Sequence, residues 1–589
     1  MSQPPVSRQR TDVLILGSGG AGLFAALHAH QADPSLSITV AVKGLLGKSG
    51  CTRMVQGGYN VALAEGDSIE RHFMDTIEGS KWLADQDLAW TLVNKAVERI
   101  HELENELGCF FDRNPDGTIH QKAFAGQTFD RTVHKGDLTG IEIINRLAEQ
   151  VWVRGIHRME EHRAIELVRT ADGSAIAGVL MIDMRTGGYV FVQAKAVLLA
   201  TGGGPTMYKY HTPSGDKSCD GLAMALRAGL PLRDMEMVQF HPTGLLAGGG
   251  TRMTGTVLEE GLRGAGGWLL NGAGERFMQN YHPTGERATR DIVSRSIYAE
   301  MRAGRTTSKG GVFIQMHHLG ADNVRRQFKG MVERCEDCGF DLAGGLVEVV
   351  PTAHYMMGGV VFNLDCTTPL AGLYAAGEDT GGVHGANRLG GNGVANSTVF
   401  GGLAGESMAA AVMAGMQLRE PDEEAIRRSI AFHEIPFTGD STGHAAGPAG
   451  DLDAIREDLF AAMWDDVGIL RTGTGLARAL ERLGELDATV ARCALPGDDR
   501  AFNLSWHDWI NLRNLIAVSR AIAASALSRQ DSRGAHFRED YPGIDDLENS
   551  TFTVVVQERG SLALRREPVT FNRVRPGETL IAKPVENSA

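Results

Sequence analysis

The sequence TDVLILGSGGAG occupies residues 11–22, close to the start of the chain. Its apolar run, residues 13–16, predicts a buried parallel strand, and residues 23–30, which lack Gly and Pro, predict a helix. Between them stands Gly-x-Gly-x-x-Gly, with Gly17, Gly19 and Gly22. In such a turn the backbone N–H groups and the helix N-terminus face a pyrophosphate, and the third glycine lets helix and strand pack closely. We therefore predict a dinucleotide-binding β-α-β unit.

Two later segments repeat this pattern of a strand followed by glycine, AVLLATGGG at 196–204 and GLYAAGE at 372–378. A further strand, residues 38–42, ends in Lys43, where a nicotinamide-binding fold usually carries an acidic residue for the ribose, so NAD is disfavoured. Three such junctions, far apart in the chain, predict one nucleotide domain that is assembled from distant segments. We expect an α/β fold with another domain inserted.

The remaining patterns predict the domain plan. Long segments without proline, at 452–467, 475–483 and 509–526, predict a helical domain, and the run TFTVVV within 551–564 predicts one or two closing strands. Residues 291–301 predict a helix within the insert. We assign the nucleotide domain to 10–240 and 355–415, the inserted domain to 241–354, the helical domain to 416–540 and a C-terminal segment to 541–589.

Composition and charge exclude several classes of protein. The 589 residues are 43% hydrophobic and 22% charged, as in soluble globular chains, and the formal net charge of −14 argues against nucleic acid or an anionic membrane as partner. No apolar run approaches a spanning helix, and the start of the chain lacks a signal-type apolar core. The seven cysteines are scattered and odd in number, which favours a reducing compartment. We expect a soluble, intracellular protein.

Motifs spread over nearly the whole chain resemble one known family, the flavoprotein subunits of succinate dehydrogenase and fumarate reductase, together with the related L-aspartate oxidases. The resemblance runs from Gly17 to the segment 532–542. It implies a Rossmann-like FAD-binding domain, an inserted α+β capping domain and a C-terminal helical domain. The motifs are Gln56-Gly-Gly, Asp220-Gly, Gln239-Phe-His-Pro-Thr-Gly244, Glu260-x-x-Arg263-Gly, Arg290-Asp, His354-Tyr-x-x-Gly-Gly359, Gly377-Glu378 and His384-Gly-Ala-Asn-Arg-Leu389.

The resemblance implies an FAD-dependent enzyme that interconverts a four-carbon dicarboxylate and its trans-alkene, with hydride passing to or from flavin N5. By this resemblance His241, His354 and Arg388 hold the substrate carboxylates, beside Glu259 and Phe124. A dianion that leaves water needs such charge-assisted donors. Arg290 matches the acid/base residue, with Glu260 and Arg263 as its proton relay. The resemblance places FAD at Gly17, Gly19, Gly20, Gly22, Lys43, Ser49, Cys51, Gln56, Gly57, Gly58, Thr201, Gly202, Asp220, Glu378 and Asn392.

One departure from the family concerns the link to the flavin. Respiratory members carry a histidine, bonded to the flavin, before Thr-x-x-x-Gln-Gly-Gly, and here Cys51 stands in that position. The histidyl bond cannot form, so we expect noncovalent FAD, with a cysteinyl link as the alternative. Loss of a covalent bond generally lowers the flavin potential, which favours fumarate reduction or a substrate that is easier to oxidise than succinate.

A second departure concerns the substrate. Glu259 stands where most members have a Thr that binds a substrate carboxylate, and two carboxylates repel each other in a low dielectric. Glu259 therefore points away, is protonated, or meets an amine or hydroxyl of the substrate. Thr254 or Thr256 could supply the missing hydroxyl, and Gly393 replaces a common Ser. An L-aspartate oxidase-like enzyme is the alternative to the succinate/fumarate reaction, and an electron carrier without its own substrate is a third hypothesis.

The route of the electrons after the flavin stays open at this point. Cys335-x-x-Cys338 has no second pair, so we interpret it as two free thiols and predict no metal site. Electrons would pass to oxygen, to a diffusible acceptor or to an iron–sulfur protein subunit. We expect a cytoplasmic location, at the inner face of the membrane if partner subunits hold the chain there.

Overall fold

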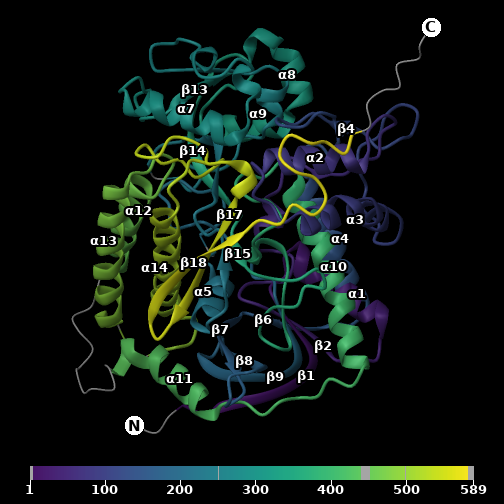
Figure 1. Ribbon diagram of the computed structural model, residues 1–589, viewed down its shortest axis with the longest axis vertical. Helices are drawn as coiled ribbons and strands as arrows, with labels where there is room; N and C mark the ends of the chain where they lie inside the picture. The colour runs from purple at the N-terminus through teal and green to yellow at the C-terminus, as the bar shows by residue number, and fades with distance from the viewer. Residues whose placement is uncertain are drawn as a thin grey trace.

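The computed structural model describes residues 4–215, 217–249, 251–438, 451–495, 497 and 499–581 (Figure 1). Parts of two predicted segments, 439–450 in the helical domain and 582–589 at the C-terminus, lie outside the described residues. Among the residues described, no helix combines the length and the apolar character needed to cross a membrane.

The largest sheet joins the three predicted strand-and-glycine junctions. Its parallel part runs in the order β6 (His157–Glu160), β2 (Ile38–Val42), β1 (Val6–Leu16) and β9 (Gly188–Leu199), and β16 (Leu373–Ala375) also pairs with β9 in parallel. The antiparallel strands β8 (Ile176–Asp183) and β7 (His162–Arg169) extend it beyond β9. The predicted apolar run at 13–16 forms the fully buried end of β1. The α/β architecture is therefore confirmed.

Helices α1 (Gly20–Ala32) and α10 (Asn392–Met413) cross closely on one face of this sheet (Figure 1). A Cβ on Gly401 would lie 2.6 Å from the carbonyl oxygen of Ala21, and one on Gly405 would lie 2.3 Å from that of Ala25. These two glycines lie one turn apart in α10, so they let the two backbones approach. The start of α1 is thereby fixed at the carboxyl ends of β1, β9 and β16.

A second sheet belongs to the predicted insert. Its antiparallel order is β11 (Val238–Leu245), β14 (Leu346–Met356), β13 (Val312–Gln315) and β12 (Trp268–Leu270). Helices α6 (Gly261–Gly264), α7 (Arg290–Arg302), α8 (Ala321–Gln327) and α9 (Lys329–Glu336) accompany it. Strand β11 lies at the start of the insert and β14 at its end. Because these two strands pair, the start and the end of the insert are held together and next to the nucleotide unit.

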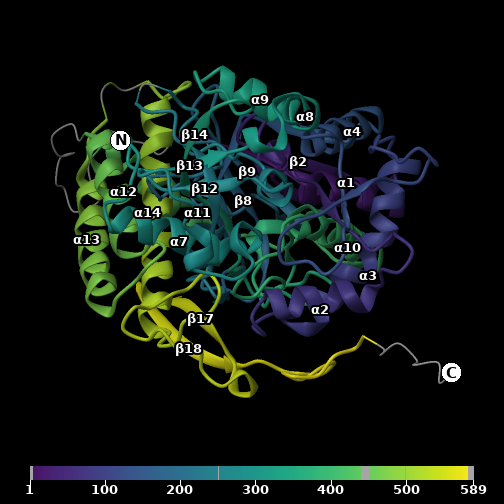
Figure 2. The same cartoon turned by 90° about the horizontal axis from the view of Figure 1, so that it is seen from above.

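The chain after residue 415 forms a helical layer and a hairpin. Helices α11 (Glu423–Thr438), α12 (Leu452–Asp466), α13 (Gly473–Arg492) and α14 (Leu504–Ser528) include all three predicted helical segments. Figure 2 shows α12, α13 and α14 along one flank. The predicted closing strands are β17 (Thr551–Glu558) and β18 (Ser561–Pro568), and β17 pairs with β10 (Leu232–Arg233), which also pairs with β15 (Gly359–Val360).

The remaining elements are short or flank the nucleotide unit. A three-stranded sheet has the order β3 (Tyr59–Asn60), β5 (Thr132–Val133) and β4 (Gln121–Lys122). Along the chain, α2 (Ile69–Gly79) and α3 (Gln86–Asn105) lie between β3 and β4, and α4 (Thr139–Val153) follows β5. Helix α5 (Asp220–Arg227) follows the second glycine junction. This small sheet carries Lys122 toward the insert, where it becomes part of the site.

The third glycine of the first motif fixes how closely helix α1 approaches strand β1. We expect Gly22→Ala to destabilise the protein by about 1–3 kcal/mol, because the added Cβ would lie 2.0 Å from the carbonyl oxygen of Gly17. Gly484→Ala is the matched control, since Gly484 lies within α13 and its Cβ would have no neighbour within 4 Å. Thermal unfolding midpoints measure both effects, and equal midpoints for the two variants would contradict the packing argument.

A buried ionic network joins α1, α3 and α10. The two ring nitrogens of His28 lie 2.8 Å from Glu102 Oε1 and 3.0 Å from Glu406 Oε1, and Arg99 contacts the same oxygen of Glu406 at 2.6 Å. Burial alone would lower the pKa of His28, but the two carboxylates outweigh burial and raise it above 6.5. The imidazolium form therefore stabilises the contact between these helices.

This network predicts a pH-dependent stability. A histidine whose pKa is raised on folding contributes stability that is complete below its unfolded pKa and is lost as pH rises through its folded pKa. We expect the thermal midpoint to fall as pH rises above 6.5 through the raised pKa of His28, and His28→Gln to flatten that slope. His101→Gln, at an exposed position of α3, is the control and should keep it. An unchanged slope in His28→Gln would refute the assignment.

Candidate active site

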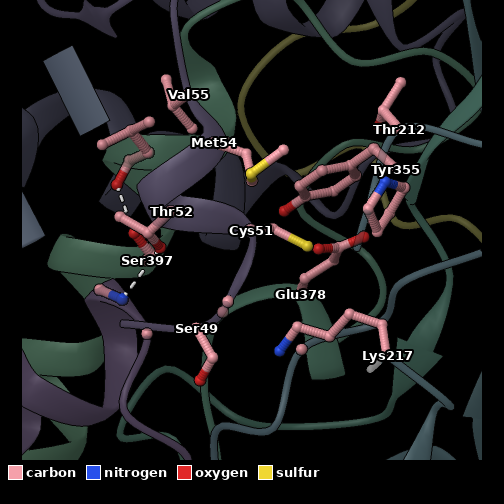
Figure 3. Close-up of a pocket in the computed structure, with 18 of the residues that line it drawn as sticks. Ser49, Cys51, Thr52, Met54, Val55, Thr212, Lys217, Tyr355, Glu378 and Ser397 are labelled. Atoms are coloured by element: carbon pink, nitrogen blue, oxygen red, sulfur yellow. Dashed lines mark hydrogen bonds between the residues drawn. The ribbon is translucent and has the colours of Figure 1, made fainter. Parts of the chain in front are cut away.

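One cavity of about 360 Å³ lies where the main sheet, the small sheet and the insert meet. Its wall includes the end of β1, the start of α1, the loop 49–58 and residues on both sides of the insert. Figure 3 shows side chains from these distant segments on one pocket. The predicted residues on its wall are Gly17, Gly19, Gly20, Lys43, Ser49, Cys51, Gln56, Gly57, Gly58, Phe124, Thr201, Gly202, Asp220, His241, Glu259, Glu260, Arg290, His354, Glu378 and Arg388.

The glycine-rich end of the cavity fits a dinucleotide. The N-cap of α1 is Gly19, which has no side chain to cap the helix, and its first turn carries no acidic residue. The bare N–H groups at this helix start therefore favour a pyrophosphate. Ser18 Oγ and Gln56 Oε1 line the same cavity, are buried and have no hydrogen-bond partner among the described residues. Such unpaired polar atoms are expected where a polar cofactor binds.

An anchored carboxylate closes one side of this end. Asp220 contacts Lys43 Nζ at 3.0 Å and Arg163 at 2.7 Å, and it also accepts a hydrogen bond from Asn514 of α14 at 2.7 Å. Burial opposes ionisation, but Arg163 and Lys43 outweigh it and lower the pKa of Asp220. Asp220 is therefore a fixed anion. Lys43 lies on the cavity wall but is already engaged, with Asp220 and with Ser218 Oγ at 3.1 Å.

The middle of the cavity brings Cys51, Tyr355 and Glu378 together (Figure 3). Cys51 begins a short 3-10 helix, and its side chain points toward the carboxyl group of Glu378. Glu378 Oε1 accepts hydrogen bonds from Met356 N at 3.0 Å and Gly204 N at 3.4 Å. Burial raises the pKa of Glu378 to about 7, so this group can carry a proton near neutral pH.

Two histidines lie side by side on the cavity wall. The rings of His241 on β11 and His354 on β14 lie 5.4 Å apart between centroids. Burial, followed by the nearby Arg290, lowers the pKa of each imidazole well below 6.5, so both rings are neutral. His241 Nδ1 accepts the N–H of Thr243 at 3.3 Å, which leaves the proton on Nε2. The neutral ring is thus a hydrogen-bond donor.

Two guanidinium groups meet beside these histidines. Gln239 Oε1 accepts from Arg290 Nη1 at 2.9 Å and from Arg388 Nη2 at 3.1 Å. Arg388 also lies over the ring of Tyr355, 4.4 Å from its centroid. Burial and the nearby charge of Arg290 lower the pKa of Arg388 to about 10, so it remains a cation at neutral pH. The shared oxygen holds both cations at the same place on the wall.

Arg290 is the first residue of a chain of three charged groups. Its Nη2 lies 2.6 Å and its Nε 3.0 Å from Glu260 Oε2, and Arg263 Nη2 lies 3.3 Å from Glu260 Oε1. Burial would raise the pKa of Glu260, but the two arginines outweigh burial and lower it. Burial lowers the pKa of Arg263. Glu260 therefore lies between two guanidinium groups and contacts both, as a proton relay requires.

Glu259 faces the cavity beside this chain, and an unpredicted cation accompanies it. Glu259 Oε2 accepts a hydrogen bond from Lys122 Nζ of β4 at 3.0 Å. Burial raises the pKa of Glu259, and Lys122 acts in the opposite direction. Glu259 thus belongs to the cavity wall, with its carboxylate held by Lys122. Of the two threonines considered as substitutes, Thr256 lines the cavity, whereas Thr254 is not on its wall and donates to Gly248 O at 3.0 Å.

Three residues assigned to the site do not reach the cavity wall. Gly22 packs against Gly17, and Arg263 lies behind Glu260. The assignment of Asn392 to the cofactor site is corrected, because its side chain points into the protein interior. It accepts from Asn60 Nδ2 at 2.9 Å, contacts His72 Nε2 at 3.0 Å and donates to Thr76 Oγ1 at 3.1 Å. Its position at the start of α10 turns the side chain toward α2 and away from the cavity.

Several wall residues were not predicted, and their sequence signals differ. Tyr355 lies on the wall, and Gln239 contacts two arginines of the wall without lining it. Both residues belong to motifs already singled out, so their places beside His241 and His354 were available as signals. Arg334 and Lys217 line the cavity but stand in no motif. Gly393 has a clear reason in the structure, because a Cβ there would lie 2.9 Å from Arg388 Nη1 and 3.1 Å from the Tyr355 ring. A side chain at 393 would require Arg388 or the Tyr355 ring to shift.

Comparison with known proteins gives the same picture. Residues 12–394 match the family model of the FAD binding domain, and residues 456–581 match that of the fumarate reductase flavoprotein C-terminus. The chain is 40% identical over 539 residues to a fumarate reductase (CoM/CoB) subunit of Methanothermobacter marburgensis, covering 90% of this chain and 94% of that one. It is 37% identical to the 8-methylmenaquinol:fumarate reductase flavoprotein subunit of Wolinella succinogenes, covering 96% and 91%.

The fold is also shared with solved structures. FrdA of E. coli quinol fumarate reductase, in a point-variant structure, superposes with a TM-score of 0.90 at 33% identity, covering 97% of this chain and 99% of that chain. The family model of the FAD binding domain alone covers more than half of the 589 residues. The chain therefore belongs to the FAD-dependent oxidoreductase family formed by the flavoprotein subunits of fumarate reductase and succinate dehydrogenase.

Proposed function

We propose that the protein interconverts a four-carbon dicarboxylate and its trans-alkene, as in the succinate/fumarate pair. The observation that carries this proposal is the convergence of His241, His354 and Arg388 on one wall, next to the chain Arg290–Glu260–Arg263. Binding groups for an anion and a buried proton relay are both needed for this reaction, and an electron carrier would need neither. The names of the three relatives described above, all of them fumarate reductases, support it.

In this proposal the dicarboxylate binds through neutral donors and fixed cations. His241 and His354 donate without adding charge, and Arg388 supplies a planar, two-pronged donor that remains ionised. His241 and Arg388 are buried and His354 is partly buried, and the limited access of water strengthens each hydrogen bond to a carboxylate. The stacking of Arg388 on Tyr355 and its hydrogen bond to Gln239 keep the guanidinium in place before the substrate arrives.

Arg290 moves the proton in this proposal, at the substrate carbon that does not exchange hydride. Bound FAD would supply hydride transfer at its N5. The cofactor would be held by the turn 17–20 and by Gln56, Asp220 and Glu378 on the cavity wall. Arg290 is an unusual acid because the ordinary pKa of a guanidinium is near 13. Its contact with Glu260 at 2.6 Å gives the proton a short way back, and Arg263 reprotonates Glu260 in turn.

We further propose noncovalent FAD, a separate electron partner and operation toward fumarate reduction. Cys51 replaces the linking histidine, and an unlinked flavin has a lower potential, which favours reduction of the alkene. The relatives are named as subunits, which supports an iron–sulfur protein as the partner that receives or supplies electrons. We propose that the chain acts in the cytoplasm, at the inner face of the membrane when partner subunits hold it there. Two relatives have a quinol in their names, and quinols dissolve in membranes, which supports this location.

Loss of the acid/base residue provides the test of the reaction. The purified holoprotein should reduce fumarate when a reduced dye supplies electrons, and Arg290→Gln should lower that rate by about 1,000-fold while flavin content stays unchanged. Arg326→Gln, at an exposed position of α8 in the insert, is the matched control and should keep the full rate. Full activity in Arg290→Gln, or no fumarate reduction by the unmodified protein, would refute the proposal.

The state of the flavin has a separate test. After denaturation and gel electrophoresis, we expect flavin fluorescence to run apart from the polypeptide, since the histidyl link cannot form. Cys51→Ser should give the same pattern and the same flavin content. Fluorescence that stays with the unmodified chain and is lost in Cys51→Ser would instead show a bond to the Cys51 thiol.

A further inference from the structure

Glu259 offers the cavity an oxygen that the protein does not use. The residue is 5% exposed and lines the wall, and its Oε2 is held by Lys122 Nζ at 3.0 Å. Its Oε1 accepts no hydrogen bond from any part of the chain that the structure describes. The neighbouring Glu260 differs, because both of its oxygens contact guanidinium groups. Oε1 is not fully buried, so it is open to a donor from water or from a ligand in the cavity.

The position of Glu259 on the cavity wall allows a bound substrate to supply that donor. Glu259 precedes Glu260 in the chain, and Glu260 contacts Arg290, which lines the same cavity. An unsubstituted dicarboxylate has no donor besides its protonated form, and its carboxylates would be repelled by Glu259. A substituent with an N–H or O–H group would instead satisfy Oε1. The wall is therefore suited to a substituted dicarboxylate.

The charges around Glu259 decide between an ammonium group and a hydroxyl group. The charge of Lys122 balances that of Glu259. The cation Arg334 lines the cavity and donates to Val257 O at 3.0 Å, and its acidic neighbour is Asp137. These four groups are neutral in sum. An ammonium group would add an uncompensated positive charge next to Lys122 and Arg334, whereas a hydroxyl group would donate to Oε1 without changing the charge.

We propose that Glu259, held by Lys122, is a specificity-determining residue that selects a four-carbon dicarboxylate bearing a hydroxyl group. This inference rests on the proposed function, because it assumes that a dicarboxylate occupies the wall formed by His241, His354 and Arg388. It goes beyond that function by naming the substituent and the atom that recognises it, Glu259 Oε1. A site that hydrogen-bonds a substrate hydroxyl discriminates strongly against analogues that lack it.

The test compares ligands of the purified holoprotein. Succinate, L-malate, D-malate and L-aspartate are each titrated, and dissociation constants are obtained from the rise of the thermal unfolding midpoint. We expect one malate enantiomer to bind at least about tenfold more tightly than succinate and than L-aspartate. Glu259→Thr should bring the malate-to-succinate ratio close to one. Lys122→Met should shift the preference toward L-aspartate, because the carboxylate then lacks its counter-ion.

A control and the fumarate reduction assay separate the possible failures. Glu333→Gln, at an exposed glutamate of α9, should leave every ratio unchanged. Equal binding of succinate and malate by the unmodified protein, or a malate preference that survives Glu259→Thr, would overturn the inference while fumarate reduction keeps the proposed function. Tightest binding of L-aspartate would also overturn it, in favour of an amine. Uniformly weaker binding of all ligands by Glu259→Thr would show that Glu259 forms only a structural ion pair, which would also overturn the inference. Absence of both binding and fumarate reduction would overturn both proposals.

Discussion

Two buried guanidinium groups, those of Arg290 and Arg388, share a single amide oxygen of Gln239, and much of the site depends on this arrangement. Cations of like charge repel each other at short range, and burial removes the water that would screen them. The protein offsets this cost with Glu260 against Arg290 and with the ring of Tyr355 against Arg388. What remains is a positive wall that a dianion would complete. Burial, together with the same field, keeps His241 and His354 neutral, so they act as donors and add no further charge.

The topology of the chain explains how these groups are brought together. Gln239 and His241 lie on β11, His354 and Tyr355 on β14, and these antiparallel neighbours are the strands by which the insert leaves and rejoins the nucleotide unit. Arg388 lies just before α10, whose glycines let it pack on α1. The anion wall and the glycine turn are therefore connected through short, rigid elements. A displacement of α1, α10 or the two strands would change the distance between the two ends of the cavity.

The departures from the family pattern fit one another in the structure. Gly393 leaves the space in which Arg388 lies over Tyr355, and a side chain there would occupy it. Glu259 adds a negative charge to the wall, and Lys122, from a small sheet that lies far earlier in the chain, neutralises it at 3.0 Å. Arg334 and Asp137 extend this cluster. The substrate end of the cavity is thus altered by compensated changes, while the groups that would move a proton keep direct contact with one another.

The sequence alone determined the nucleotide unit and the residue types of the site. Local patterns were sufficient there, because Gly17, Gly19 and Gly22 impose a turn on the backbone and the short apolar run 13–16, which that turn ends, is typical of a buried strand. The helices after residue 451 were predicted from long segments without proline, and the closing strands from the run TFTVVV. Tertiary structure decided what each side chain meets. Neither the pairing of Glu259 with Lys122 nor the place of Arg334 is coded by spacing, since the partners are distant in sequence. The side chain of Asn392 turned inward because Asn60 and Thr76 offer it partners that only the folded chain brings close.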